Sequence, residues 1–378
     1  MTYAFWDANQ QPAVEKQIAA FEASHPGIKV EPQVTPWADY WTKLQTSLGG
    51  GAGFDVFWSN GPNFPVYASQ GAFEPLDVDA SAYPKSLVDL YTYNGKLYGA
   101  PKDFDTIAMF YNKSLFDKAG VAYPTADWTW DDLRTAAKKL TITSGGQTSQ
   151  WGFAATPASQ SVFLNLIYQN GGSVFNADGT KSMLAEPAAC EALKFLYSIQ
   201  QDGSSPSAAD QQANSWDLTQ LFGSGKIAMY FGGSWMVKPF HEASPSIDVA
   251  PLPKGKQRAS IIHGLGQVVW SGGTHKDTAK QFVAFLATKE AQEILANESA
   301  VIPAMNGLQK KWVESVPSMN LKVFLDAVDY SVPFPVTKKG PEWIGAAETA
   351  LQDVWLGTVP ADQLCQHVAE AVDAALAK

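Results

Sequence analysis

Residues 2–58 read TYAFWDANQQPAVEKQIAAFEASHPGIKVEPQVTPWADYWTKLQTSLGGGAGFDVFW, and the expected fold class follows from the pattern of these residues. Its apolar residues recur first with the period of a strand and then with the period of a helix, and the pattern repeats. The elements that it predicts are a strand at 2–6, a helix from Pro12 to the stop at His25-Pro26-Gly27, a strand at 28–31, a helix over 37–48 and a strand at 54–58. Strands and helices that alternate at this spacing are typical of a parallel sheet with crossover helices.

The rest of the chain predicts a second α/β domain. A β-like run at 106–111 precedes helical segments, one of which begins at the capping box Thr129-Trp130-Asp131-Asp132 and runs through Leu140. No repeat with a period of about 20 to 50 residues interrupts the pattern. The later elements that we expect are strands at 226–231, 247–250 and 266–270, and helices over 276–288, 290–297 and most of 341–378. The whole pattern predicts a two-domain α/β protein.

Length and charge narrow the classes of partner. The chain has 378 residues, enough for two or three domains at roughly 150 residues each. Asp and Glu number 37 against 27 Lys and Arg, so the net charge of −10 has the wrong sign for attraction to nucleic acid or anionic lipid. The longest purely apolar run is 282–287, far short of the roughly 18 residues that span a bilayer. The strand-like start at Thr2 indicates that any export signal has been removed.

The cysteines and histidines give no sign of a metal site. Cys190 and Cys365 lie far apart in stretches that read as amphipathic helices, so we expect two free thiols in the core. A metal knuckle or a C-x-x-C redox pair is not supported. The five histidines show no ligand spacing such as H-x-x-x-H. We expect neither a metal ion nor a cofactor.

Motifs typical of catalytic sites are incomplete in this chain. Residues 223–227, GSGKI, lack the spacer of a phosphate loop, and Gly264-Leu265-Gly266 lacks the third glycine of a dinucleotide fingerprint. No G-x-S-x-G elbow occurs. Asp103 and Asp105 could form the carboxylate pair of a glycosidase, but two acids at alternate positions are more often a polar ligand contact or a solvated turn. The sequence favours a binding protein, with a glycan-cleaving enzyme as the alternative.

The aromatic and arginine content favours a neutral ligand. The chain has 13 Trp, 13 Tyr and 20 Phe but only two arginines, Arg134 and Arg258. Arginine is the preferred partner of carboxylate and phosphate groups, and neither of these two lies in a segment that looks like a site. Ligands that stack on aromatic rings are therefore favoured over amino acids, peptides and phosphates.

Short motifs along almost the whole chain resemble those of the family 1 extracellular solute-binding proteins, the sugar-binding subunits of ABC importers. Each motif is short, and their joint order and spacing carries the resemblance. The motifs are Ile18-Ala19-Ala20-Phe21-Glu22, His25-Pro26-Gly27-Ile28-Lys29-Val30, Phe54-Asp55-Val56-Phe57-Trp58, Tyr98-Gly99-Ala100-Pro101, Tyr111-Asn112-Lys113, Trp128-Thr129-Trp130-Asp131-Asp132-Leu133 and Gly225-Lys226-Ile227-Ala228-Met229 before Gly233-Ser234-Trp235.

The resemblance implies a two-lobe periplasmic-binding-protein (Venus-flytrap) fold with crossover hinge strands and the ligand in the cleft between the lobes. The lobes would comprise 1–110 with 260–310, and 111–259 with 311–378. The implied protein is a monomeric extracytoplasmic receptor, periplasmic or lipid-anchored, that captures a sugar and delivers it to the permease of an ABC importer, and we expect the sugar to be an oligosaccharide. Within the binding class, a polyol or sugar-phosphate receptor is the alternative, and the scarcity of arginine disfavours phosphate.

The resemblance also identifies aromatic residues that would stack on sugar rings. Trp235 follows Gly233 and Ser234, which are candidate ligand contacts as well, and the family's aromatic at this motif stacks on the sugar. Trp58 and Trp343 match the family's cleft and C-terminal aromatics. Trp37 shares its helix with core residues, so a core position and a ligand contact are equally open for it.

Polar candidates follow from the ends of the predicted strands, because open α/β sheets bind ligands at the carboxyl ends of their strands. Asp105 occupies the position of the family's acidic ligand contact, and a carboxylate can accept bonds from two sugar hydroxyls. Amides both donate and accept, as neutral polyols require. The remaining candidates are Asn9, Gln10, Asn60, Gln160 and His263, for each of which a structural role in a loop or the core is the alternative.

Overall fold

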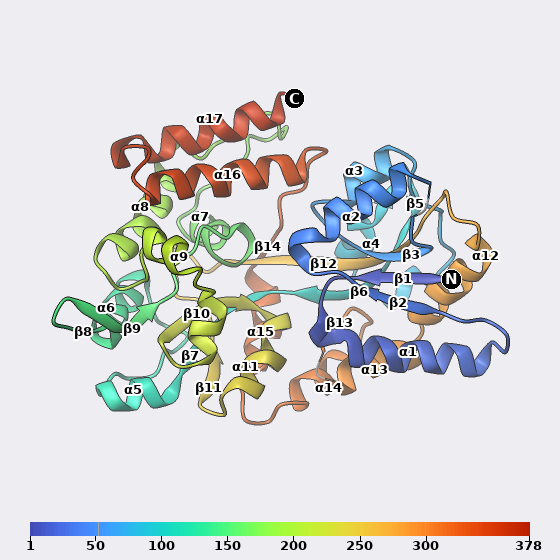
Figure 1. Cartoon of the computed structure of the whole chain (residues 1–378), viewed down its shortest axis with the longest axis horizontal. Coiled ribbons are helices and arrows are strands. Elements are labelled where there is room, and N and C mark those ends of the chain that lie inside the picture. Colours follow the sequence, from blue (N-terminus) through green and yellow to red (C-terminus); the bar gives the residue numbers. More distant parts are fainter. Residues whose placement is uncertain (52, 299) are drawn as a thin grey trace. The chain divides into compact units, whose positions relative to one another are not determined.

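The structure is a computed structural model that describes residues 1–51, 53–298 and 300–378, and the chain forms two compact units (Figure 1). Unit 1 comprises Met1–Asp105, His263–Pro317 and Val336–Lys338. Unit 2 comprises Thr106–Ile262, Ser318–Pro335 and Lys339–Lys378. The chain first leaves unit 1 after Asp105 and returns to it at His263, where the expected lobe boundaries are 110 and 260.

Unit 1 is built on a mixed sheet with parallel and antiparallel pairs. Its strands are β1 (Thr2–Phe5), β2 (Glu31–Val34), β3 (Val56–Asn60), β6 (Gly99–Asp105), β12 (Ser260–Val269) and β13 (Ile302–Pro303), in the order β13-β6-β12-β3-β1-β2. β1 is parallel to β2 and β3, whereas β12 is antiparallel to β3 and β6. The carboxyl ends of β1, β2, β3 and β6 therefore lie at one edge of the sheet, which we call the carboxyl edge of unit 1. A separate hairpin pairs β4 (Thr92–Tyr93) with β5 (Lys96–Leu97).

Helices cover both faces of this sheet, because alternate strand residues face opposite sides. Tyr3 and Phe5 pack into one hydrophobic cluster with α1 and α12, while Ala4 between them packs into a second cluster with α2 and α3. In Figure 1, α1 and α2 lie on opposite sides of the strands. The helices of unit 1 are α1 (Gln11–Ser24), α2 (Trp37–Gly49), α3 (Phe64–Ser69), α4 (Lys85–Leu90), α12 (Lys276–Leu286), α13 (Lys289–Asn297) and α14 (Gln309–Glu314).

The second strand begins three residues later than the sequence pattern predicts. Val30 is buried in the cluster around α1, and Ile28 packs against it, so their alternation reflects core contacts of the chain leaving the helix. The register with β1 starts at Glu31, which lies opposite Thr2 and whose N–H donates to the carbonyl of Met1 at 2.9 Å. The predicted strand at 28–31 was therefore wrong in its bounds.

Unit 2 has a five-stranded sheet in the order β11-β7-β10-β9-β8. The strands are β7 (Ile107–Asn112), β8 (Ile142–Ser144), β9 (Gln147–Phe153), β10 (Ile227–Gly233) and β11 (Ile247–Ala250), and β14 (Ser331–Pro333) pairs with the start of β12. β9 and β10 are parallel, so the segments that follow them leave the same edge of the sheet.

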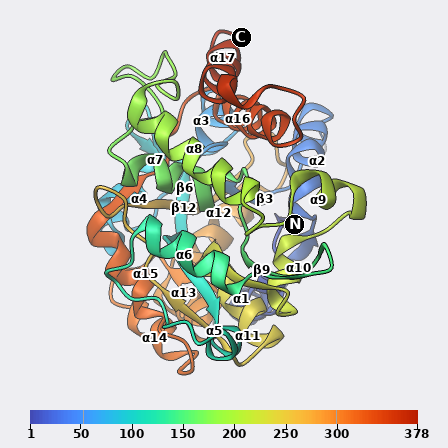
Figure 2. The ribbon, with the colours of Figure 1, turned by 90° about the vertical axis from the view of Figure 1, so that its left-hand side faces the viewer.

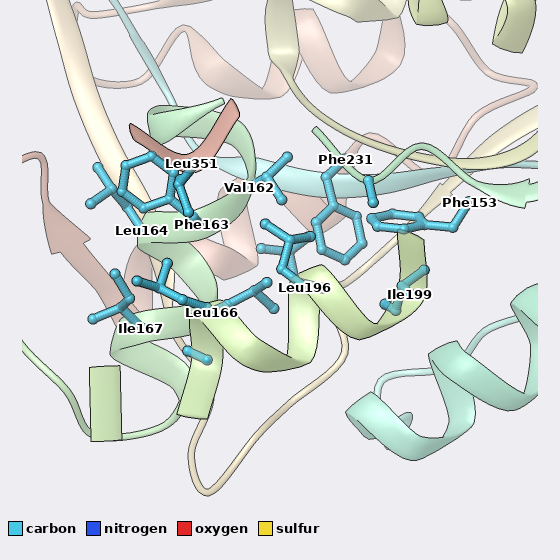
Figure 3. Packing of buried hydrophobic residues seen from close by; sticks show 14 of the residues in the cluster. Phe153, Val162, Phe163, Leu164, Leu166, Ile167, Leu196, Ile199, Phe231 and Leu351 are labelled. Atoms are coloured by element: carbon cyan, nitrogen blue, oxygen red, sulfur yellow. The ribbon is translucent and has the colours of Figure 1, made fainter. Parts of the chain in front are cut away.

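The helices of unit 2 surround a hydrophobic core in which Phe153 and Phe231 meet Leu196 (Figure 3). The capping box at Thr129 is confirmed, since its side chain and that of Asp132 cap each other's backbone at the start of α6. The helices are α5 (Lys113–Ala119), α6 (Trp130–Leu140), α7 (Leu164–Gln169), α8 (Pro187–Gln201), α9 (Ala208–Asn214), α10 (Leu218–Gly223), α11 (Val237–Ala243), α15 (Lys322–Asp326), α16 (Gly340–Trp355) and α17 (Leu364–Leu376). With a helix-covered sheet in each unit, the predicted two-domain α/β class is confirmed.

The prediction of two free thiols was wrong. Cys190 of α8 and Cys365 of α17 form a disulfide, with their Cα atoms 5.3 Å apart. α17 runs beside α16 in both views (Figure 2) and packs against α8, which brings together two cysteines that are 175 residues apart in the sequence. The spacing of the two cysteines along the sequence does not predict this contact.

No helix among residues 1–51, 53–298 and 300–378 is long and apolar enough to cross a membrane.

Candidate functional site

The polar candidates of unit 1 gather at its carboxyl edge. Asn60 ends β3 and Asp105 ends β6, while His263 faces Asp105 in the register of β12 with β6. Asn9 and Gln10 lie in the turn that follows β1. Asn9, Gln10, Asn60 and Asp105 lie at this edge because β1, β3 and β6 run in the same direction, and the antiparallel β12 places His263 there opposite Asp105.

The turn after β1 is organised by a carboxylate. Asp7 Oδ1 accepts hydrogen bonds from the backbone N–H and the side-chain amide of Asn9, each at 3.0 Å. Asp7 Oδ2 accepts from Gln10 Nε2 at 2.8 Å, and Gln10 Oε1 in turn accepts from Lys102 Nζ at 2.6 Å. Both ends of the Gln10 amide are therefore engaged within the unit, and Gln10 is buried, whereas Asn9 is exposed. Asn9 is the better placed of the two to contact a ligand.

Asp105 and His263 form a close pair at the same edge. Asp105 Oδ2 lies 3.7 Å from His263 Nδ1, and both side chains are buried. Burial lowers the pKa of His263 to about 4. The imidazole is therefore neutral at neutral pH, where it can both donate and accept a hydrogen bond.

Aromatic rings form a connected cluster beside these polar groups. Trp58 is fully buried, and its indole N–H donates to the Tyr3 hydroxyl at 2.6 Å. Trp6 covers it, with ring centroids 5.2 Å apart, and Trp6 also meets Trp37 at 5.2 Å. Trp37 is 52% exposed and Trp6 is half-buried, so these two rings offer surface that Trp58 does not. Trp6 was not among the predicted residues, although its place directly after β1 is the signal that predicts Asn9.

In unit 2, the turn after β10 presents Trp235. Gly233 ends β10, and Ser234, which is buried, begins the short helix Ser234–Met236. A Cβ atom at Gly233 would lie 1.8 Å from the indole of Trp235, so the ring lies directly over the Gly233 backbone. The glycine is required for this close approach. Trp235 remains half-buried and keeps part of its surface exposed.

The segment after β9 carries Gln160 and meets a carboxylate of α16. Gln160 lies in the π-helical turn Ser159–Phe163, and its buried Nε2 has no hydrogen-bond partner among the described residues. Glu348 accepts a hydrogen bond from the Ser159 N–H at 2.9 Å, and burial raises the pKa of the Glu348 carboxyl. Glu348 was not predicted from the sequence, because nothing in its own helix distinguishes it from a solvated acid.

Trp343 lies in the core of unit 2. It is fully buried between Phe175 and Phe334, with ring centroids 5.1 and 6.1 Å away. Its indole Nε1 has no hydrogen-bond partner within the part of the chain that the structure describes. Its contact with a ligand stays a prediction.

Asp103, the other acid of the suggested glycosidase pair, is engaged inside unit 1. It is 1% exposed, and its Oδ2 accepts a hydrogen bond from Lys102 Nζ at 2.6 Å. Burial raises the pKa of its carboxyl, and Lys102 opposes the shift. Among the described residues, no group of three or more His, Cys, Asp or Glu side chains could hold a metal ion.

The chain is similar in sequence to a known protein family and to several characterised proteins. The model of the family described as "Bacterial extracellular solute-binding protein" matches residues 7–293. The chain is 24% identical to a galactooligosaccharide-binding protein of Bacillus subtilis, over 96% of this chain and 86% of that protein. It is 26% identical to a lactose-binding protein of Rhizobium radiobacter, over 89% of this chain and 87% of that protein.

A solved structure covers both units. The ABC substrate-binding protein of Listeria monocytogenes in complex with cycloalternan is 30% identical and superimposes with a TM-score of 0.93, covering 100% of this chain and 98% of that one.

Proposed function

Because this chain belongs to the family of bacterial extracellular solute-binding proteins, we propose that it binds a carbohydrate outside the cytoplasm and delivers it to the permease of an ABC importer. The observation that carries the proposal is the carboxyl edge of unit 1. There Trp6 and the exposed amide of Asn9 lie in the segment that follows β1, Trp37 begins α2 and its ring meets that of Trp6, and Asp105 ends β6. Sugar rings have apolar faces that stack on aromatic side chains and hydroxyl rims that bond to amides and carboxylates.

Unit 2 contributes a comparable set of groups. The partly exposed ring of Trp235 supplies a second stacking surface, and Gln160 and Glu348 supply polar groups on the segment after β9 and on α16. Each set by itself combines aromatic surface with polar groups, as contact with a carbohydrate requires. Several aromatic surfaces suit a ligand of more than one ring, in line with the oligosaccharides named for the relatives in Bacillus subtilis and Listeria monocytogenes.

A neutral ligand fits better than a sugar phosphate. Both arginines of the chain are engaged in unit 2: Arg134 pairs with Asp202 at 3.0 Å, and Arg258 donates to the carbonyl of Ala126. The carboxyl edge of unit 1 carries the carboxylates of Asp7 and Asp105, which would repel an anion. The polyol alternative remains compatible with these groups, whereas the phosphate alternative lacks the expected arginine.

The disulfide supports a site of action outside the cytoplasm. Disulfides form and persist in oxidising compartments and are rare in the reducing cytosol. The family is an extracellular one. A removed export signal, a location in the periplasm or on a lipid anchor, and a monomeric state are parts of the proposal that fit such a receptor.

The glycan-cleaving alternative has less support than the receptor. The matching family is one of solute-binding proteins, and Asp103 is held in a buried ion pair rather than opposite a second acid across a substrate. A retaining or inverting glycosidase needs two carboxyl groups that flank the scissile bond.

A thermal-shift screen tests the proposal. The panel comprises lactose, galactooligosaccharides, arabinooligosaccharides and cycloalternan, with glucose 6-phosphate and sorbitol for the alternatives. A ligand at 100 times its dissociation constant should stabilise the protein by about 2.7 kcal/mol. Calorimetry then measures the affinity, for which we expect a micromolar constant, or about −8 kcal/mol. The absence of a shift with every carbohydrate would refute the proposal, and new products on chromatography after incubation would favour the enzyme.

A further inference from the structure

Lys102 of β6 is a fully buried lysine inside unit 1. Its Nζ lies 2.6 Å from Asp103 Oδ2, 2.6 Å from Gln10 Oε1 and 4.3 Å from the centroid of the Trp58 ring. Removing an ammonium group from water is costly unless it is paired and hydrogen-bonded. The carboxylate, the amide oxygen and the ring face together compensate the buried charge.

The contacts of Lys102 lead directly to the turn after β1. Gln10 Nε2 donates a hydrogen bond to Asp7. The Asp7 carboxylate also accepts hydrogen bonds from the backbone N–H and the side-chain amide of Asn9. A continuous chain of hydrogen bonds therefore runs from Asp103 on β6 to the exposed Asn9, each at 3.0 Å or less.

Lys102 also contacts an aromatic residue at the carboxyl edge of unit 1. Its ammonium group lies over the ring of Trp58, whose indole N–H is held by Tyr3. The ring of Trp6 in turn packs against Trp58 in an edge-to-face contact, with an interplanar angle of 88°. Lys102 thus contacts both Gln10, which is linked through Asp7 to Asn9, and Trp58, against which the ring of Trp6 packs.

We propose that Lys102 is a positioning residue of the carbohydrate site, which holds Gln10 and Trp58 so that Asn9 and Trp6 are in place before the ligand arrives. The inference rests on the proposed function for the identity of the ligand. It reassigns Gln10 from a ligand contact to a link within the protein, because both ends of its amide are in use. Groups that are already ordered lose less entropy on binding, so such positioning strengthens affinity.

A role in stability alone explains the arrangement less well. Buried ion pairs are often no more stabilising than apolar side chains of the same volume. If stability were the only role, neutral replacements that fill the space would leave ligand binding unchanged.

The test compares three variants with the parent protein. Lys102→Met combined with Asp103→Asn removes both charges at similar volume and leaves no unpaired carboxylate. Gln10→Leu breaks the link while the ion pair remains. Phe73→Leu is the control, because Phe73 is buried in unit 1 and bridges to Trp270, just beyond the end of β12 that lies away from the carboxyl edge.

The rate of amide hydrogen exchange at residues 8–10 in the free protein measures how well the turn after β1 is ordered. We expect exchange roughly tenfold faster or more in the double variant and in Gln10→Leu, and no change in Phe73→Leu. Calorimetry with the carbohydrate that binds the parent should show affinity weaker by roughly tenfold or more in the same two variants only. Adding Gln10→Leu to the double variant should cause little further loss, because both act through one link.

Parent-like exchange and parent-like affinity in the double variant would overturn the inference, as would equal losses in Phe73→Leu. If the double variant does not fold, Gln10→Leu decides by the same two measurements. If the parent binds no carbohydrate, the proposed function fails, and the exchange rates still decide whether Lys102 holds the turn.

Discussion

Removal of the disulfide between Cys190 and Cys365 should lower the stability of unit 2 strongly. The bond closes a loop of 175 residues, and the loss of chain entropy in the unfolded state corresponds to about 5 kcal/mol for a loop of that length. For a unit of roughly 200 residues, each kcal/mol changes Tm by about 2–4 °C. We therefore expect a fall in Tm of about 10 °C or more for unit 2 when the bond is removed.

Scanning calorimetry of Cys190→Ser combined with Cys365→Ser measures the effect, because this variant has no cysteine left. A reducing agent should lower the Tm of the parent by a similar amount and should leave the double variant unchanged. Equal Tm values for the parent and the variant would refute the reasoning. So would the labelling of two free thiols in the parent unfolded without reductant.

Four further changes test the site. Trp235→Ala should weaken carbohydrate binding by about 2–4 kcal/mol with little change in the Tm of the free protein, and a large loss of stability with intact affinity would identify a core residue. Gly233→Ala should weaken binding by displacing that ring, whereas Gly232→Ala, whose added Cβ meets its neighbours at 3.3 Å rather than 1.8 Å, should do so much less in the same titration. Asp105→Asn should reduce affinity by about 1.5–3 kcal/mol in calorimetry, and equal affinities would remove Asp105 from the site. Because burial raises the pKa of Glu348, its ionised form destabilises the fold, so Glu348→Gln should raise Tm near pH 7. That gain should disappear by about pH 3, well below the pKa of about 4.3 of an unfolded Glu, where the carboxyl of the parent is protonated in both states, and a gain independent of pH would contradict the assigned cause.

The fold class could be read from the sequence because the signals that determine it are local. The alternation of strand and helix periods in residues 2–58 reports which face of each element is buried, and both faces of the unit 1 sheet are covered accordingly. The capping box at Thr129 is a contact between residues three positions apart, so its geometry is contained in the motif. The strand at 28–31 was misplaced because burial of Val30 produces the same alternation as strand pairing.

Part of the candidate site could also be read from the sequence. Asn60 and Asp105 end parallel strands, and the rule that such ends meet at one edge needs only the order of elements along the chain. The same rule applied to the residue directly after β1 would have added Trp6. The ligand contacts of these residues stay predictions.

Other features depended on the tertiary structure, because each joins residues whose separation along the chain carries no signal. Cys190 and Cys365 meet only because α8 and α17 pack together, and a pattern of two distant cysteines in amphipathic helices fits free thiols equally well. In the sequence Lys102 is followed closely by two acids, Asp103 and Asp105. In the structure it is buried against Gln10 and Trp58. Periodicity tells which side of an element faces the interior, but the partner found there is set by the packing of elements that are distant in sequence.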